Sequence, residues 1–169
     1  MNYHNITKDD MNNGDGVRVV LWVAGCEHHC PECHNMSTWS YDSGIEFDKY
    51  ALQELKEELS KDYVSGITFS GGDPLAPQNR ASTLALIYWV RVRYPDKTIW
   101  LYTGYTYEQL TSSNSPINDE ALLNIDVLVD GKYVKELRDV NLKWRGSKNQ
   151  RVIDVRKSMK ERKVVLHCE

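Results

Sequence analysis

The stretch "VRVVLWVAGCEHHCPECHN", residues 17–35, joins an apolar run to a loop that is rich in cysteine. Residues 17–23 carry β-branched valines between "NGDG" and a glycine, which is the pattern of a buried strand. The loop that follows holds three of the four cysteines in CxxxCxxC spacing: Cys26, Cys30 and Cys33. Thiols this close together are more typical of a metal centre than of unrelated buried side chains. The sequence therefore predicts a strand whose carboxyl end opens into a metal-binding loop.

Strands and helices alternate along the rest of the chain. Apolar runs predict strands at 63–70, 98–103 and 126–131, with weaker strands at 151–155 and 163–168. Apolar residues at helical spacing predict helices that start near Asp48, that span 81–92 and that lie around 119–124. This alternation favours βαβ units and a mostly parallel sheet, hence an α/β fold. A closed barrel needs about 250 residues, so a chain of 169 residues forms a doubly wound sheet or a partial (β/α) barrel.

Both architectures bind ligands at the carboxyl ends of the strands. Polar or glycine-rich segments follow each of the first four predicted strands: the cysteine loop, "SGGDP" at 70–74, "TGYT" at 103–106 and "DGK" at 130–132. Parallel strands bring these ends to one edge of the sheet. The sequence therefore predicts a functional site at this edge.

The composition indicates one globular domain, residues 1–169, with a formal net charge of −3 that gives no general case for nucleic-acid binding. No apolar run is long enough to span a membrane, and "MNYHNITKDD" does not resemble a signal peptide. We therefore expect a cytoplasmic protein, in a reducing compartment that disfavours disulfides. The basic C-terminal segment from about 156 is read as a solvated helix face, with a docking patch for an acidic partner as the alternative.

Two kinds of metal centre remain open for the cysteine loop. One is zinc with a histidine as fourth ligand, which would make the chain a non-catalytic, zinc-clipped binding module. Structural zinc sites usually use a second ligand pair, and the distant Cys168, expected to be a free thiol on the C-terminal tail, does not supply one. The other is a [4Fe–4S] cluster, which normally takes four thiolates. Three thiolates would leave one iron open to a substrate or cofactor.

Five sequence blocks carry a family resemblance: "NGDGVRVVLWVAGCEHHCPECHN", "FSGGDPLAPQN", "LYTGYT", "VLVDGKY" and "WRGSKNQR". The three-cysteine motif after the first strand is similar to that of radical S-adenosylmethionine enzymes. The five blocks in this order resemble the glycyl-radical activating enzymes that serve anaerobic ribonucleoside-triphosphate reductases. The resemblance covers residues 1 to about 155, and it implies a partial (β/α) barrel of the radical SAM type.

The resemblance also implies a reaction. Cys26, Cys30 and Cys33 would hold a [4Fe–4S] cluster, and S-adenosyl-L-methionine would chelate the open iron. One electron, from a donor such as reduced flavodoxin, would cleave the sulfonium to methionine and a 5′-deoxyadenosyl radical. That radical would take a hydrogen atom from a glycine of the large catalytic subunit of the reductase. The chain would thus be a radical SAM oxidoreductase.

The resemblance assigns cofactor contacts to the strand ends. Gly71, Gly72 and Asp73 would bind the methionine ammonium, through backbone carbonyls and a carboxylate. Alone, "GGDP" is better read as an ordinary Gly-Gly turn, but the nearby cysteine loop favours the binding role. Asp130 and Lys132 would serve the methionine carboxylate, with a β-turn as the structural alternative. Thr103 lies where related enzymes contact the ribose.

The resemblance is incomplete beside the third cysteine. Many relatives carry an aromatic residue where this chain has Glu32, so the backbone from Glu32 through Cys33 to His34 would contact adenine, and His34 would take the planar role. His28 and His29 are expected to face solvent or to pack rather than to bind iron. Arg18, in the family's GxR segment, would shape the loop or contact a partner. The block "WRGSKNQR" suits a surface loop that positions a partner segment.

Overall fold

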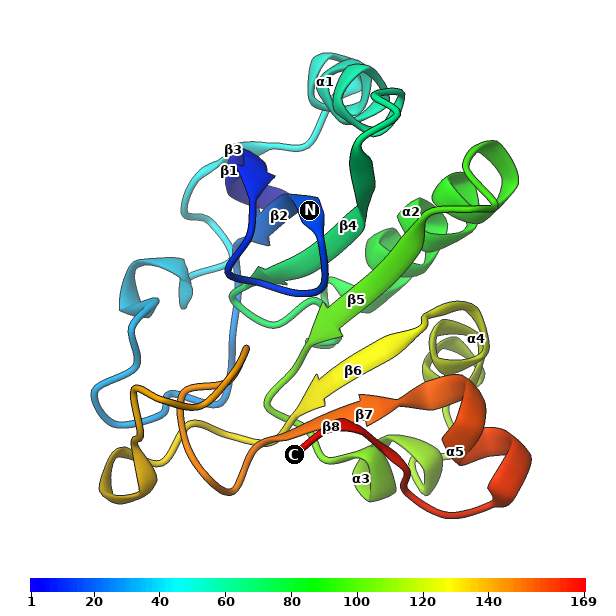
Figure 1. Cartoon of the computed structure of the whole chain (residues 1–169). Coiled ribbons are helices and arrows are strands. Elements are labelled where there is room, and N and C mark those ends of the chain that lie inside the picture. Colours follow the sequence, from blue (N-terminus) through cyan, green and yellow to red (C-terminus); the bar gives the residue numbers. More distant parts are fainter.

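Eight strands form a single open sheet in the computed structural model, which describes residues 1–169 (Figure 1). The order across the sheet is β3-β1-β2-β4-β5-β6-β7-β8. The strands are β1 (Asn2–Asp10), β2 (Val17–Val23), β3 (Ile45–Glu46), β4 (Val64–Gly71), β5 (Thr98–Tyr102), β6 (Val127–Asp130), β7 (Arg151–Asp154) and β8 (Leu166–Cys168). The predicted α/β class is confirmed.

The centre of the sheet is parallel and its margins are antiparallel. Strands β2, β4, β5 and β6 pair in parallel, as the βαβ pattern predicts. Strands β1 and β3 on one side, and β7 and β8 on the other, pair antiparallel with their neighbours. The sheet is therefore mixed, and the parallel strands bring four carboxyl ends to one edge.

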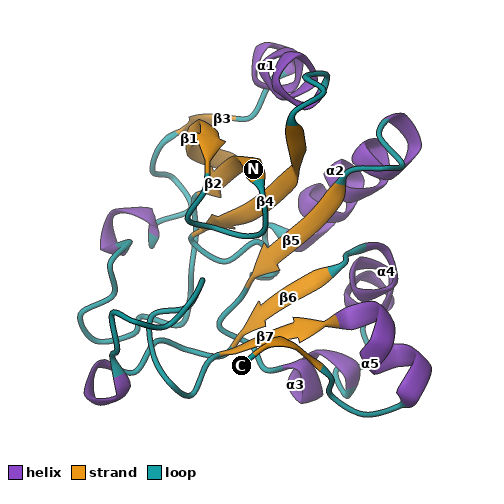
Figure 2. Cartoon of the chain, viewed as in Figure 1, coloured by secondary structure: helices purple, strands orange, loops and turns teal.

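Five α-helices connect the strands: α1 (Lys49–Leu59), α2 (Arg80–Arg93), α3 (Tyr107–Thr111), α4 (Pro116–Asn124) and α5 (Val155–Glu161). Two short 3₁₀ helices are η1 (Met36–Thr38) and η2 (Lys135–Leu137). As predicted, α1 begins next to Asp48, the N-cap residue, whose carboxylate accepts the backbone N–H groups of Tyr50 and Ala51. Figure 2 shows the long loops gathered where the arrowheads of β4, β5 and β6 point, away from α1, α2 and α4.

The two faces of β5 divide the core. Ile99 and Leu101 join a cluster of 24 buried residues that includes apolar side chains of α1, α2 and α4. Trp100 faces the other way and packs with Val127, Val129 and Val152, as the two-residue period of a strand requires. Trp144 packs against this second cluster, so the second face supports the loops at the carboxyl ends.

The C-terminal segment belongs to the sheet. The exposed side chains of Arg156, Lys157 and Lys160 lie on α5, as a solvated helix face requires. Cys168 has a free thiol. It belongs to β8 and pairs with Val152 of β7, so it does not lie on a free C-terminal tail. None of the helices combines the length and the apolar composition that a membrane span requires.

Candidate functional site

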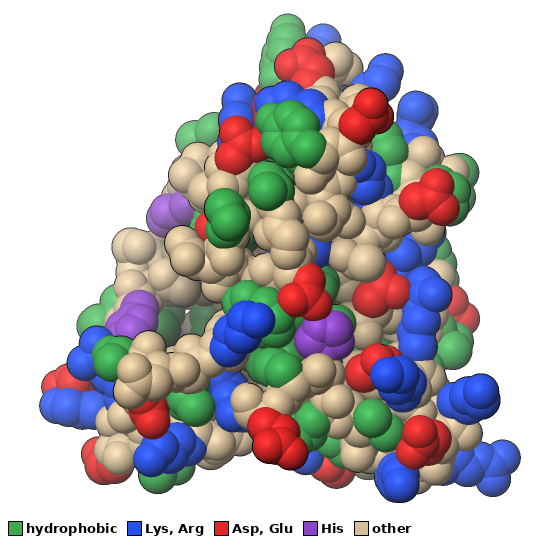
Figure 3. Space-filling view, in the orientation of Figure 1, with side chains coloured by type: hydrophobic (Ala, Val, Ile, Leu, Met, Phe, Trp, Pro, Cys, Tyr) green, Lys and Arg blue, Asp and Glu red, His purple; other side chains and the backbone are tan.

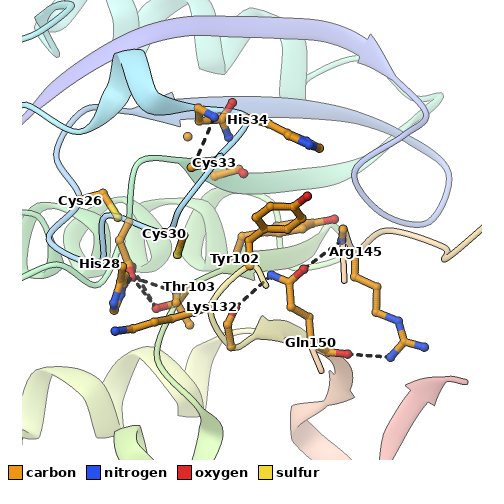
Figure 4. Close-up of a pocket in the computed structure, with 18 of the residues that line it drawn as sticks. Cys26, His28, Cys30, Cys33, His34, Tyr102, Thr103, Lys132, Arg145 and Gln150 are labelled. Carbon is orange, nitrogen blue, oxygen red and sulfur yellow. Dashed lines mark hydrogen bonds and ion pairs between the residues drawn. The ribbon is translucent and has the colours of Figure 1, made fainter. Parts of the chain in front are cut away.

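A cavity of about 530 Å³ lies at the carboxyl ends of β2, β4, β5 and β6 (Figure 4). The cysteine loop and the segments after β4, β5 and β6 each contribute residues to its lining. Of the residues predicted for the site, nine line it: Cys26, Cys30, Cys33, His34, Gly71, Gly72, Asp73, Thr103 and Lys132. The edge of the sheet that the sequence indicated therefore carries a concave site.

The three cysteines of the loop are half-buried free thiols. Burial raises the pKa of Cys26 to about 11, against the effect of the His28 and His29 backbone N–H groups. Burial also raises the pKa of Cys30, against a backbone N–H from Tyr133. The backbone N–H of Asn35 donates to Cys33 Sγ at 3.3 Å. A backbone N–H group directed at sulfur suits iron–sulfur ligation, because such a hydrogen bond stabilises the thiolate and tunes the cluster.

The histidines of the loop are engaged elsewhere. The His28 ring contacts Asp73, the His29 ring stacks on Trp39 at 4.6 Å, and the His34 ring lies 5.2 Å from Tyr133. No group of three or more His, Cys, Asp or Glu side chains converges as the ligands of one ion do. Zinc needs four ligands within about 2.3 Å of one point. Thiols that line a cavity without converging on a single point instead suit the larger body of a cluster.

The two glycines after β4 are required by a close approach of two backbones. Gly71 has φ of 99°, and a Cβ on it would lie 2.6 Å from the backbone N and O of Val23. A Cβ on Gly72 would lie 2.4 Å from the carbonyl oxygen of Gly25. The Gly72 and Asp73 N–H groups donate to the carbonyls of Val23 and Gly25 at 2.7 and 2.8 Å. The glycines therefore fix this turn against the start of the cysteine loop.

Asp73 is the centre of a buried hydrogen-bond network. The residue is 1% exposed, and its carboxylate accepts the N–H groups of Leu75 and Gly104 at 2.8 and 3.0 Å. It also accepts the Thr103 hydroxyl at 2.9 Å and the His28 ring Nε2–H at 2.6 Å. This carboxylate joins the cysteine loop to the ends of β4 and β5.

Two residues of this region, His28 and Asn79, were not predicted from the sequence to belong to the site. His28 was expected to face solvent or to pack; it packs against Tyr105 at 4.6 Å, and its side chain is largely buried. A Cβ on Gly104 would lie 2.3 Å from the His28 ring, so the glycine leaves room for that ring. Asn79 donates its amide to the carbonyls of Ala24 and Asp73 at 2.8 and 3.0 Å. Only the fold brings these partners together.

We expect Asp73→Asn to lower the free energy of unfolding by about 2–4 kcal/mol. An amide has one acceptor oxygen where the carboxylate has two, so its NH₂ group would face the donors of His28 or Gly104. Urea unfolding followed by circular dichroism measures the loss. Asp62→Asn, at an exposed position, is the control and should change the value by less than about 0.5 kcal/mol. Equal stability of the two variants would contradict the network.

Two predicted site residues do not line the cavity. Asp130 is buried with its carboxylate held by Arg151, at 3.0 Å to Nε, and by the backbone N–H of Tyr107 at 2.8 Å. Glu32 is exposed and forms an ion pair with Lys135 at 2.5 Å. In this arrangement, neither side chain would contact a ligand in the cavity directly.

The block "WRGSKNQR" forms a wall of the cavity instead of a detached surface loop. Trp144, Arg145 and Gln150 all line the cavity. Figure 4 shows Arg145 and Gln150 across the cavity from Cys26 and Cys30. The Gln150 side chain accepts the N–H groups of Gly146 and Ser147 and donates to the Gly131 carbonyl at 2.9 Å. These bonds tie the wall to the turn that carries Lys132.

The amino-acid sequence matches the family described as a 4Fe-4S single cluster domain over residues 12–153, a range that contains every residue lining the cavity. It is 47% identical over 152 residues to the anaerobic ribonucleoside-triphosphate reductase-activating protein of Enterobacteria phage T4, covering 90% of this chain and 93% of the phage protein. The proteins of that name from Escherichia coli K12 and Vibrio cholerae are each 43% identical. Those alignments cover 92% and 89% of this chain, and 100% and 96% of the relatives.

Proposed function

The chain belongs to the family of anaerobic ribonucleoside-triphosphate reductase-activating proteins, and we propose that it activates such a reductase as a radical SAM oxidoreductase. In the proposed reaction, one electron passes through a [4Fe–4S] cluster and cleaves the sulfonium C–S bond of S-adenosyl-L-methionine to methionine and a 5′-deoxyadenosyl radical. This radical takes a hydrogen atom from a glycine of the large catalytic subunit, leaving 5′-deoxyadenosine and a glycyl radical.

The cysteine loop would hold the cluster. Cys26, Cys30 and Cys33 would supply three thiolates to the cavity, and the backbone N–H of Asn35 already donates to Cys33 Sγ. No fourth side chain of the loop would bind the cluster, which would leave one iron free to bind a cofactor. This choice of ligands supports binding of a cofactor at the metal, by the logic that separates catalytic from structural metal sites.

Other groups that line the cavity would bind S-adenosyl-L-methionine. The carbonyl oxygen of Gly72 accepts no hydrogen bond within the protein and suits the methionine ammonium. The ammonium of Lys132 has no ion-pair partner and suits the methionine carboxylate. The Thr103 side chain lines the cavity and suits a ribose contact, and the backbone from 32 to 34 suits adenine. Among these residues, His34 offers the planar side chain.

The two aspartates would act by positioning and not by contact. Asp73 already accepts hydrogen bonds from four groups, so it would hold the binding loop in shape beside the ammonium. Asp130 would hold Arg151 and thereby the turn that carries Lys132. Glu32, on the outside, would contribute only its backbone.

We further propose that residues 1–169 act as one radical SAM domain, with the open sheet as its partial (β/α) barrel and with the basic segment from about 156 on its surface. The reaction needs a strong reductant, and a reduced flavodoxin in the cytoplasm would supply it. The observation that carries the whole proposal is the convergence of three cysteines with Gly72 and Lys132 on one cavity in a chain of this family.

Anaerobic EPR of the reconstituted and reduced protein tests the proposal. We expect a [4Fe–4S]⁺ signal whose g-values change when S-adenosyl-L-methionine is added, because the cofactor would bind the open iron. Asp62→Ala, at an exposed position outside the cavity, is the control and should leave both the signal and its change intact. A colourless protein that contains zinc and no iron would instead support the non-catalytic binding module.

A further inference from the structure

Residues 132–148 form a basic patch on a chain of negative charge. They contain six Lys and Arg residues and two acidic residues, a net charge of +4, whereas the whole chain carries −3. Five of the six cations are exposed: Lys132, Lys135, Arg138, Lys143 and Lys148. Figure 3 shows Lys and Arg side chains on the corner of the molecule that holds η2, next to a hollow in the surface. Positive charge is therefore concentrated on this segment, as it also is on the basic segment from about 156.

Most of this charge is not neutralised within the protein. Only Lys135 and Lys148 have carboxylate partners, Glu32 at 2.5 Å and Asp139 at 3.8 Å, and three of these four side chains are more than half exposed. Exposed pairs of this kind contribute little to stability. The same segment presents two apolar side chains to solvent, since Leu137 is 40% and Val140 is 78% exposed. Exposed apolar groups ringed by cations are typical of a transient protein interface.

The basic patch borders the cysteine loop directly. The Lys135–Glu32 pair joins the two segments, and the rings of Tyr133 and His34 lie 5.2 Å apart. Tyr133 also lines the same cavity as Cys30. A molecule docked on this patch would therefore lie next to the proposed metal centre.

The proposed function consumes one electron for each S-adenosyl-L-methionine cleaved, and the electron must come from another molecule. Resting on that function, we propose that the 132–148 basic patch is the docking surface of an acidic one-electron carrier protein. The carrier is oxidised by one electron and the metal centre beside the patch is reduced by one. The electron is then used when the sulfonium C–S bond breaks.

The charge of the patch fits this occupant. Complementary charge raises the rate of encounter by about 10- to 10³-fold and suits brief contacts, which a carrier that must leave after each transfer requires. Weak electron-transfer complexes also use small interfaces, and one loop with two apolar side chains offers a small one.

Stopped-flow reduction of the reconstituted protein by fully reduced flavodoxin tests the assignment. The variant Lys143→Glu/Lys148→Glu reverses two charges of the patch without changing a residue that lines the cavity. We expect its second-order rate constant to fall by about tenfold or more at low ionic strength, and the difference to shrink in 0.5 M salt. The neutral variant Lys143→Gln/Lys148→Gln should fall less, and it serves if the charge reversal impairs folding.

The matched control is Lys160→Glu/Lys163→Glu, on and after α5. Like the test pair, it combines a lysine that forms no ion pair with one that has a carboxylate partner, here Glu161 at 3.3 Å. Its rate constant should equal that of the unchanged protein. Photochemical reduction by a small deazaflavin, followed by EPR, should be equal for all variants and shows that each holds a reducible cluster.

Two outcomes would overturn the assignment. In one, the patch variant and the control are reduced by flavodoxin at the same rate. In the other, the patch variant keeps its reduction rate but loses affinity for the reductase, which makes the patch a reductase interface. Failure of the proposed function looks different, because then the unchanged protein takes up no cluster and the small reductant gives no EPR signal.

Discussion

Replacing Cys30 with alanine is expected to abolish cluster binding and cleavage of S-adenosyl-L-methionine, and Cys26→Ala and Cys33→Ala are expected to do the same. The three thiols line one cavity, and no histidine of the loop is placed to substitute for a missing ligand, since each ring is already packed or hydrogen-bonded. Two thiolates cannot retain a cubane cluster that normally needs at least three of its four ligands from protein. Iron content, the absorbance near 400 nm and release of 5′-deoxyadenosine measure the effect.

Cys168→Ala is the matched control for these variants. Cys168 is also a half-buried free thiol, but it lies in β8 beside Val152, away from the residues that line the cavity. We expect it to keep its iron and its activity, with a loss of stability of about 1 kcal/mol at most. Retained cleavage in any of the three loop variants would overturn the ligand assignment. Loss of iron in Cys168→Ala would show that the count of three ligands is wrong.

The strands and helices that build the site were predictable because their side chains carry a strong period. Buried valines mark β2, and the apolar runs of β4, β5 and β6 are continuous because both faces of these strands are covered. Strand β1 was missed because only Tyr3 and Ile6 of its nine residues are buried. Its place in the sheet comes from backbone pairing with β2 and β3, which leaves no period in the sequence.

The site was predictable as a set of loops but not as a set of contacts. The sequence placed the cysteines, Gly72 and Lys132 at strand ends, and the parallel sheet brings these ends together. The orientation of the Asp130 side chain depends on β7, because this strand pairs antiparallel with β6 and places Arg151 directly opposite Asp130. The bond from His28 to Asp73 joins residues 45 positions apart, so only the folded chain reveals it.

Arg18→Met is expected to lower the free energy of unfolding by about 3–5 kcal/mol. Arg18 was predicted to shape the loop or to contact a partner, and the structure excludes the contact because the side chain is fully buried. Its guanidinium donates five hydrogen bonds: to the Asp15, Ile67 and Thr98 carbonyls and to the Thr68 and Thr98 hydroxyls. It also lies 5.4 Å from the ring centroid of Trp100.

The expected loss comes mainly from the acceptors that methionine would leave unpaired. Three backbone carbonyls lose their donor, and each buried acceptor without a partner costs about 1–3 kcal/mol. Burial offsets part of this loss, since it lowers the pKa of Arg18 to about 10 and so disfavours the charge, which is nevertheless kept at neutral pH. The cost of three carbonyls without a donor exceeds the gain from removing one buried charge, so the substitution is expected to be destabilising.

The loss should also reach the cavity. Thr68 accepts from Arg18 and donates to the carbonyl of Asn13, which lines the cavity, so the guanidinium fixes that wall through the threonine. Urea unfolding of Arg18→Met measures the stability, with Arg93→Met at an exposed position of α2 as the control that should change it by less than about 0.5 kcal/mol. A loss below about 1 kcal/mol for Arg18→Met would mean that water or a shift of the 11–16 turn satisfies the three carbonyls. Arg18 would then be dispensable to the sheet.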